Sequence, residues 1–173
     1  MILNIEIKAI CSDPGAVRQW LEAQGAHYTG LDHQIDTYFH TPQGRLKLRE
    51  GNIEQALIYY NRPETAGLKK SEILLYQAPA DPGLKAILST VLGVKTVVDK
   101  ERHIYFMDNV KFHVDAVKGL GHFVEIEAID TDGSRTEQEL RDQCLYFQQQ
   151  LGISGEQLIA ASYSDLLLQH DAS

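Results

Sequence analysis

The sequence predicts an α+β protein in which an antiparallel β-barrel, or a strongly curved antiparallel sheet, packs against helices. Three observations lead to this prediction. About seven or eight segments of the 173-residue chain alternate between apolar and polar residues, the period-2 pattern of β-strands. Most of these segments are joined by short, turn-like links typical of hairpins. One face of nearly every strand is aliphatic and is expected to pack against helices, while the opposite face carries charge.

The first two elements are predicted from local signals. Residues 1–10 alternate cleanly and are expected to form a strand. A helix follows, because Ser12 or Asp13 can cap it at the start and Gly25 ends it. Further strands are expected at residues 35–39, 45–50, 56–62, 70–77, 95–106, 110–117 and 121–129, and further helices at residues 81–93, 136–151 and 156–169.

Length and composition fit one domain, residues 1–173. The net charge of −8 argues against a nucleic-acid or anionic-membrane partner held by bulk electrostatics. Cys11 and Cys144 are too few for a disulfide framework and are expected to be buried or half-buried free thiols. The early charges Glu6 and Lys8 argue against a signal peptide, and no apolar run approaches the roughly 18 residues of a membrane span. We therefore expect a cytoplasmic protein, either monomer or homodimer.

The charged strand faces allow two interpretations. They could form a solvated, salt-bridged sheet, or they could line a barrel that binds a polyanion. In the second case Lys and Arg would contact phosphates, and clustered carboxylates would bind divalent cations. The cations on these faces are Lys8, Lys47, Arg49, Arg62, Lys100 and Arg102, and the acids are Glu6, Asp36, Asp115, Glu125 and Glu127.

A series of short motifs resembles one known family in both order and spacing. The motifs are Asn4-Ile5-Glu6-Ile7-Lys8-Ala9, Asp36-Thr37-Tyr38-Phe39, the segment 44–50, Tyr60-Asn61-Arg62-Pro63, Lys100-x-Arg102, Phe112-His113-Val114-Asp115, the segment 119–127 with its Glu125-x-Glu127, and the segment 161–167. Together they resemble the CYTH superfamily, the triphosphate tunnel metalloenzymes. Within it the class IV adenylate cyclase-like branch is the most similar. The resemblance covers residues 4 to about 167.

This resemblance implies an eight-stranded antiparallel tunnel that binds a triphosphate together with Mg²⁺ or Mn²⁺. Carried over by position, the metal-binding acids would be Glu6, Asp115, Glu125 and Glu127. The triphosphate would be bound by Lys8, Lys47, Arg49, Arg62, Lys100 and Arg102. The residues expected to take part in catalysis are Glu6, Lys100, Glu125 and Glu127.

One position departs from the family pattern. Asn4 stands where the signature has its first Glu, and an amide oxygen can bind a hard cation without contributing charge. A second metal ion would therefore be held more weakly. Tyr38, Tyr60 and His113 are interpreted as packing or hydrogen-bonded residues, with stacking on a base or activation of a hydroxyl as the alternative.

Three functions remain open. The first is an adenylate cyclase that converts ATP to cyclic AMP and pyrophosphate. The second is a triphosphatase acting on tripolyphosphate or on an organic triphosphate such as thiamine triphosphate. The third is a non-catalytic module that binds nucleotide or polyphosphate. Both enzymes would act by positioning and charge neutralisation, so the same tunnel fits either one.

Overall fold

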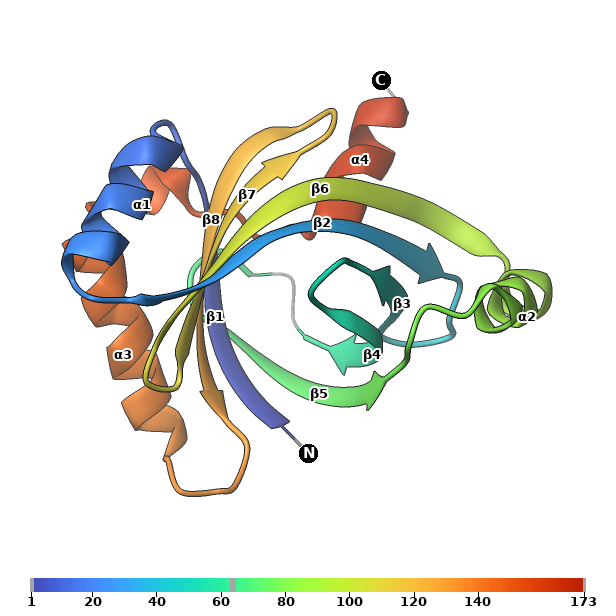
Figure 1. Ribbon diagram of the computed structural model, residues 1–173, viewed down its shortest axis with the longest axis horizontal. Helices are drawn as coiled ribbons and strands as arrows, with labels where there is room; N and C mark the ends of the chain where they lie inside the picture. The colour runs from blue at the N-terminus through green and yellow to red at the C-terminus, as the bar shows by residue number, and fades with distance from the viewer. Residues whose placement is uncertain (1, 63–64, 173) are drawn as a thin grey trace.

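The chain folds around one closed antiparallel β-barrel, shown in Figure 1. The computed structural model describes residues 2–62 and 65–172. Around the barrel the strands follow the order β1-β5-β4-β3-β2-β6-β7-β8. Their bounds are β1 Ile2–Ile10, β2 His27–Phe39, β3 Arg45–Glu50, β4 Gln55–Asn61, β5 Lys69–Gln77, β6 Val94–Met107, β7 Val110–Val117 and β8 Gly121–Asp130. The predicted eight-stranded barrel is confirmed. Pro63, which ends one of the sequence motifs, lies outside the described residues.

The alternation of side chains along β1 sets the inside and the outside of the barrel. Ile5 and Ile7 are buried in the main hydrophobic core outside the barrel wall, whereas Asn4, Glu6 and Lys8 line the interior. This core also contains Phe112, Ile126, Leu140 and Cys144. Cys144 and Cys11 are buried free thiols, as expected. The apolar face therefore stabilises the fold, and the polar face is available for a site.

Within the described residues, four α-helices lie outside the barrel. They are α1 Pro14–Ala23, α2 Pro82–Leu92, α3 Glu137–Gln150 and α4 Tyr163–Asp171, and a short 3₁₀ helix, η1, spans Gly155–Gln157. Figure 1 shows α1 and α3 together on one side of the barrel, with α2 at the opposite end. Local caps explain where the helices begin: Asp13 accepts from the Ala16 amide at 3.0 Å, and Thr136 forms a capping box with Glu139. None of the helices within the described residues combines the length and apolarity needed to cross a membrane.

Two sequence predictions about the elements were wrong. The strand expected at residues 35–39 begins at His27, because the preceding residues pair with β6 through a bulge at Gly30, where φ is +143°. The helix expected at residues 156–169 is interrupted, and only η1 and α4 are helical. Between them Leu158 forms a β-bridge with Ala9, the Ile159 amide donates to the Lys8 carbonyl at 2.9 Å, and Lys69 Nζ donates to the carbonyls of Ile159 and Ala160, at 2.8 and 2.6 Å.

The helices cover the barrel unevenly. They pack mainly on β1, β7, β8 and the adjoining part of β6; Lys70 at the start of β5 pairs with Glu137 of α3 at 2.7 Å, but the rest of the outer face of β5 is exposed. On this face Leu74 is 57% exposed and Tyr76 is 68% exposed. The expectation that the aliphatic face of nearly every strand packs against a helix was therefore wrong for β5.

Candidate active site in the barrel interior

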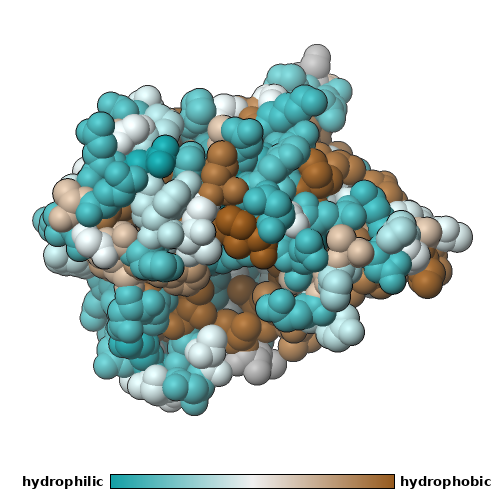
Figure 2. All heavy atoms as spheres, in the orientation of Figure 1, coloured by the Kyte–Doolittle hydropathy of each residue, from teal (hydrophilic) through white to brown (hydrophobic). Residues whose placement is uncertain are grey.

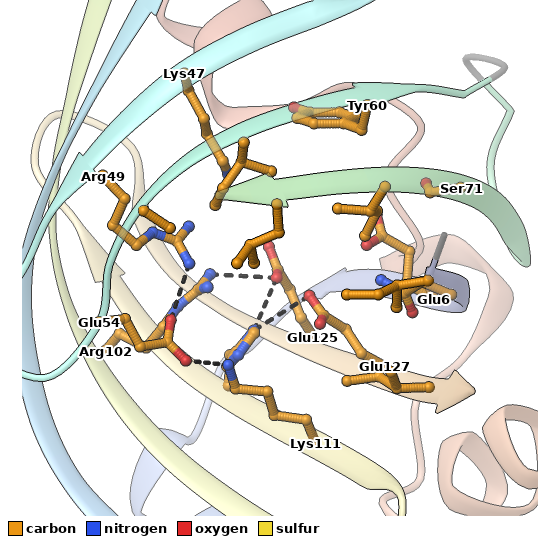
Figure 3. A pocket seen from close by; sticks show the side chains of 18 of the residues that line it. Glu6, Lys47, Arg49, Glu54, Tyr60, Ser71, Arg102, Lys111, Glu125 and Glu127 are labelled. Carbon is orange, nitrogen blue, oxygen red and sulfur yellow. Dashed lines mark hydrogen bonds and ion pairs between the residues drawn. The ribbon is translucent and has the colours of Figure 1, made fainter. Parts of the chain in front are cut away.

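The barrel encloses a cavity of about 380 Å³ whose wall is rich in charge. All six cations expected to bind a triphosphate line it, as do three of the four acids expected to bind metal; the exception is Asp115. The charged lining residues are Glu6, Lys8, Lys47, Arg49, Glu54, Arg62, Lys100, Arg102, Lys111, Glu125 and Glu127. Figure 3 shows several of these side chains converging from opposite walls. The barrel thus gathers charges from all parts of the chain into one space.

Asp36 organises the cations on one wall. It lies in β2 directly opposite Arg49 of β3, whose Nε and Nη2 each donate to the carboxylate at 2.9 Å. Lys100 donates to Asp36 at 2.9 Å, and Lys47 lies 3.3 Å away. Burial raises the pKa of Asp36, but the charges of Arg49 and Lys100 outweigh it and hold this pKa well below its usual range. Asp36 is therefore ionised and fixes three cations around itself.

Asp115 plays the same structural part for Arg102. The Arg102 guanidinium donates to both oxygens of Asp115, at 2.7 and 2.6 Å, and the Tyr163 hydroxyl donates to one of them at 2.7 Å. Asp115 is almost fully buried, and it is not among the described residues that line the cavity. The structure therefore places this expected metal ligand behind a cation, with its oxygens already in use.

Glu125 and Glu127 face the cavity with His113 between them. Glu125 lies 3.1 Å from Lys8 Nζ, 3.2 Å from Arg102 and 3.0 Å from His113 Nδ1. His113 Nδ1 is also 3.5 Å from Glu127. Burial raises the pKa of Glu125, but Lys8 and Arg102 lower it to well below its usual range. Burial and Arg102 also lower the pKa of His113, which favours the neutral imidazole.

The same three residues fit a divalent cation. One ligand atom from each of His113, Glu125 and Glu127 lies within 4.8 Å of the other two. Glu6 adds a further carboxylate nearby, because it is the cross-strand partner of Glu127. Carboxylate oxygens are the ligands that Mg²⁺ and Mn²⁺ prefer, and a neutral imidazole is also a metal ligand. The donor set is thus chemically suited to such a cation.

Lys100 differs from the neighbouring Arg49 and Arg102 in having a lowered pKa. It is buried, and burial together with the charge of Arg102 lowers its pKa to about 7, although Asp36 acts in the opposite direction. Its ammonium also lies 5.5 Å from the centre of the Tyr163 ring. Lys100 can therefore gain or lose a proton near neutral pH, which suits a group that transfers protons.

Several residues that line the cavity were not among the predicted site residues. Glu54 accepts from Arg49 Nη1 at 3.0 Å and pairs with Lys111, so it bridges β3 and β7 (Figure 3). Lys111 and His113 share the inward face of their strand with Asp115, and this alternation was a usable signal. Glu54 lies in the turn between β3 and β4, where no strand pattern marks it.

Tyr163 was also missed as a site residue. Its ring lies 3.7 Å from Lys8 Nζ, and it reaches the cavity because α4 begins beside the barrel interior. The resemblance motif at residues 161–167 marked this segment without assigning the tyrosine a role. Tyr38 and Tyr60, interpreted from the sequence as packing or hydrogen-bonded residues, line the same cavity.

The charge balance of the interior leaves room for an anion together with a cation. Seven Lys and Arg side chains line the cavity, against four lining carboxylates and the buried Asp36 and Asp115 that pair with them, so with neutral His113 the formal excess of this group is one positive charge. A triphosphate carries several negative charges, and one divalent ion would reduce the difference. The seven are Lys8, Lys47, Arg49, Arg62, Lys100, Arg102 and Lys111, and the six are Glu6, Asp36, Glu54, Asp115, Glu125 and Glu127.

The closed antiparallel barrel and its charged interior define a class of tunnel proteins, and comparison with known proteins identifies the family. The CYTH domain model matches residues 3–163, so the chain belongs to the CYTH domain family. The suspected family membership is thereby confirmed.

Individual relatives are similar over nearly their whole length. A protein of Methanocaldococcus jannaschii named "Putative adenylate cyclase" is 25% identical over 176 residues, which covers 95% of this chain and 98% of the relative. Among solved structures, the PH1012 protein from Pyrococcus horikoshii OT3 has a TM-score of 0.75 at 24% identity, covering 94% of this chain and 98% of its own. HpAC1 from Hippeastrum, described as a "putative adenylyl cyclase" with a dominant triphosphatase activity, has a TM-score of 0.63 at 14% identity and covers 100% and 97%.

Proposed function

We propose that this protein is a metal-dependent enzyme that acts on a triphosphate bound in the barrel, and that it converts ATP to cyclic AMP and pyrophosphate. The observation that carries the proposal is the convergence of seven cations on one enclosed cavity, beside a cluster of His113, Glu125 and Glu127. Arg and Lys are the side chains that bind phosphate oxygens most strongly. The name of the M. jannaschii relative supports the choice of reaction.

The divalent cation would be bound by Glu125, Glu127 and His113, with Glu6 beside them. When bound, such a cation neutralises phosphate charge and orients the reacting oxygens. Mg²⁺ and Mn²⁺ both fit this donor set. Asp115 is not assigned to the metal in this proposal, because its two oxygens already bind Arg102 and Tyr163.

The other charged residues would bind and orient the substrate. Arg49 and Arg102 are each held by a bidentate carboxylate, so each guanidinium keeps one orientation without a ligand. Such preorganisation lowers the cost of binding and of stabilising charge during the reaction. Lys8, Lys47 and Arg62 would add point charges along the polyphosphate. In the cyclase reaction the ribose 3′-hydroxyl attacks the α-phosphorus, and pyrophosphate leaves.

Lys100 is assigned a proton-transfer role in this scheme. Its pKa of about 7 in the unliganded protein would rise when a phosphate binds beside it, so Lys100 would carry a proton in the complex and could donate it to the leaving pyrophosphate oxygen. Its contact with Asp36 at 2.9 Å fixes the position of Nζ. Lys100 lines the cavity and is only 2% exposed.

A triphosphatase is the second candidate, because the same cavity could orient a water molecule toward the terminal phosphorus. The carboxylates of Glu125 and Glu127 and the imidazole of His113 could all accept a hydrogen bond from such a water. The description of HpAC1 as having a dominant triphosphatase activity supports this alternative. A non-catalytic binding module is the third, and weaker binding of a second metal at Asn4 is its only support.

The decisive experiment is a product assay with ATP and, separately, tripolyphosphate, each in Mg²⁺ and in Mn²⁺. Cyclic AMP together with pyrophosphate is the expected result with ATP. Orthophosphate without cyclic AMP would instead identify a triphosphatase. Binding of either compound without any product would contradict both enzyme assignments.

A further inference from the structure

The inner wall formed by β8, β1 and β5 changes from charged to neutral along its length. Along β1 the inward residues run from Lys8 and Glu6 to Asn4 and then Ile2. Along β8 they run from Glu125 and Glu127 to Ile129, and along β5 Ser71 is followed by Ile73 and Leu75.

The strand register aligns these three series. Asn4 lies opposite Ser71 of β5 and opposite Ile129 of β8, and Ile2 lies opposite Ile73. We call the group Asn4, Ser71, Ile2, Ile58, Ile73, Leu75 and Ile129 the neutral section.

Two polar atoms in the neutral section have no partner. Asn4 Oδ1 and Ser71 Oγ are both buried, both residues line the cavity, and neither atom makes a hydrogen bond within the part of the chain that the structure describes. Leaving a buried polar group unpaired costs free energy. Two such atoms side by side on the neighbouring strands β1 and β5 therefore indicate that a ligand provides their missing hydrogen bonds.

The surroundings of these two atoms specify the chemistry of that ligand. The rest of the neutral section is aliphatic, and Figure 2 shows hydrophobic residues gathered around a hollow beside the N-terminal end of β1. An anionic phosphate is poorly solvated in such surroundings. A neutral group with a large apolar area is stabilised there, provided that it offers a hydrogen-bond donor to the amide and hydroxyl oxygens.

We infer that the neutral section binds the organic group of an organic triphosphate, and that Asn4 and Ser71 hydrogen-bond to an N–H or O–H of that group. The inference rests on the proposed function and narrows it, because inorganic tripolyphosphate would leave the neutral section unused. A nucleobase has the required chemistry: it is neutral, largely flat and apolar, and carries N–H donors at its edge. The residue that departs from the family signature, Asn4, thus acquires a role in substrate selection.

The test separates affinity for the organic group from affinity for the phosphates. Binding of ATP, UTP and tripolyphosphate to the whole chain is measured by calorimetry with a chelator present, so that no turnover intervenes. The nucleotide that binds the wild-type protein more tightly is then compared with tripolyphosphate in the variants Asn4→Leu and Ser71→Ala. We expect each variant to lose about tenfold in nucleotide affinity, the effect of one hydrogen bond, and to bind tripolyphosphate within about twofold of wild type.

Thr37→Val is the matched control. Thr37 Oγ1 is also buried and unpartnered among the described residues, but Thr37 does not line the cavity. This variant should bind both ligands as the wild type does, and its thermal unfolding shows what the loss of a buried hydroxyl does to the fold alone. Ser71→Ala is small enough to keep the test valid if Asn4→Leu fails to fold.

The possible outcomes distinguish a failure of the role inferred for the neutral section from a failure of the proposed function. Equal losses for nucleotide and tripolyphosphate, or no loss for either, would overturn the role of the neutral section and leave the triphosphate site intact. Failure of the wild-type protein to bind any of the three compounds, with or without Mn²⁺, would overturn the proposed function itself.

Discussion

The carboxylates inside the barrel form two layers that differ in what their oxygens contact. Asp36 and Asp115 lie behind the cavity wall, and each accepts two hydrogen bonds from one arginine. Glu125 and Glu127 lie at the cavity surface, where they surround His113. The comparison teaches that the buried layer holds the cations in position, whereas the surface layer has carboxylate oxygens facing the space where a ligand would bind.

The largest expected effect comes from the surface layer. Glu127→Gln keeps the shape of the side chain and removes its charge, so turnover should fall by more than about a hundredfold, the upper range for residues that only support a metal ligand. A product assay measures this, and circular dichroism should show an unchanged fold. Glu72→Gln is the control, because Glu72 is exposed on the outer face of β5. Wild-type turnover in Glu127→Gln would contradict the metal assignment.

Substitutions in the buried layer should mainly lower the stability of the protein. Asp115→Asn leaves the buried Arg102 guanidinium without its bidentate partner, which should cost about 3 kcal/mol of unfolding free energy. Urea denaturation measures this loss. The double variant Arg102→Met, Asp115→Leu removes both charges and should be less destabilised than Asp115→Asn alone. A loss below about 1 kcal/mol in Asp115→Asn would show that this carboxylate does not hold the arginine.

Arg49 contacts the buried layer and the cavity surface, so its removal should weaken the binding of tripolyphosphate. Arg49 pairs with Asp36 behind it and with Glu54 at the cavity surface. Arg49→Ala should weaken tripolyphosphate binding about ten- to a hundredfold, since it removes charge-assisted hydrogen bonds. Calorimetry measures the affinity. Arg141→Ala on α3, which removes an ion pair with Glu137 outside the barrel, should bind as the wild type does. Unchanged affinity in Arg49→Ala would exclude it from the binding surface.

The smallest effect is a proton taken up on binding. The pKa of Lys100 in the unliganded protein is about 7, and a phosphate beside it favours the protonated form, so its pKa rises in the complex. At pH 8 tripolyphosphate binding should therefore take up part of one proton. The contribution of Lys100 to affinity should be full below pH 7 and should be lost as the pH rises through the pKa of the complex.

Calorimetry at pH 8 in two buffers of different ionisation enthalpy measures this proton uptake. Lys100→Arg, which stays charged at every accessible pH, is the control and should take up less. Equal uptake by the wild-type protein and Lys100→Arg would assign the proton to another group.

Much of the fold was predictable because its determinants are local. The alternation in β1, β7 and β8 predicted both the strands and their inward residues, and Asp13 and Gly25 predicted the limits of α1 to within two residues. Where the prediction failed, a distant contact decided the structure. The N-terminal half of β2 is a strand because it pairs with β6, and the segment before α4 is not helical because β1 and Lys69 bind its backbone.

The sequence by itself determined which residues point into the barrel and which family the chain belongs to, since alternation and motif order are properties of the linear chain. Only the tertiary structure decided which charges meet. Asp36 contacts Lys100, 64 residues away, and Asp115 contacts Tyr163, 48 residues away, because closure of the barrel and the start of α4 bring them together. A strand pattern gives the face of a residue but not its partner. The division of the acids into two layers therefore exists only in the folded protein.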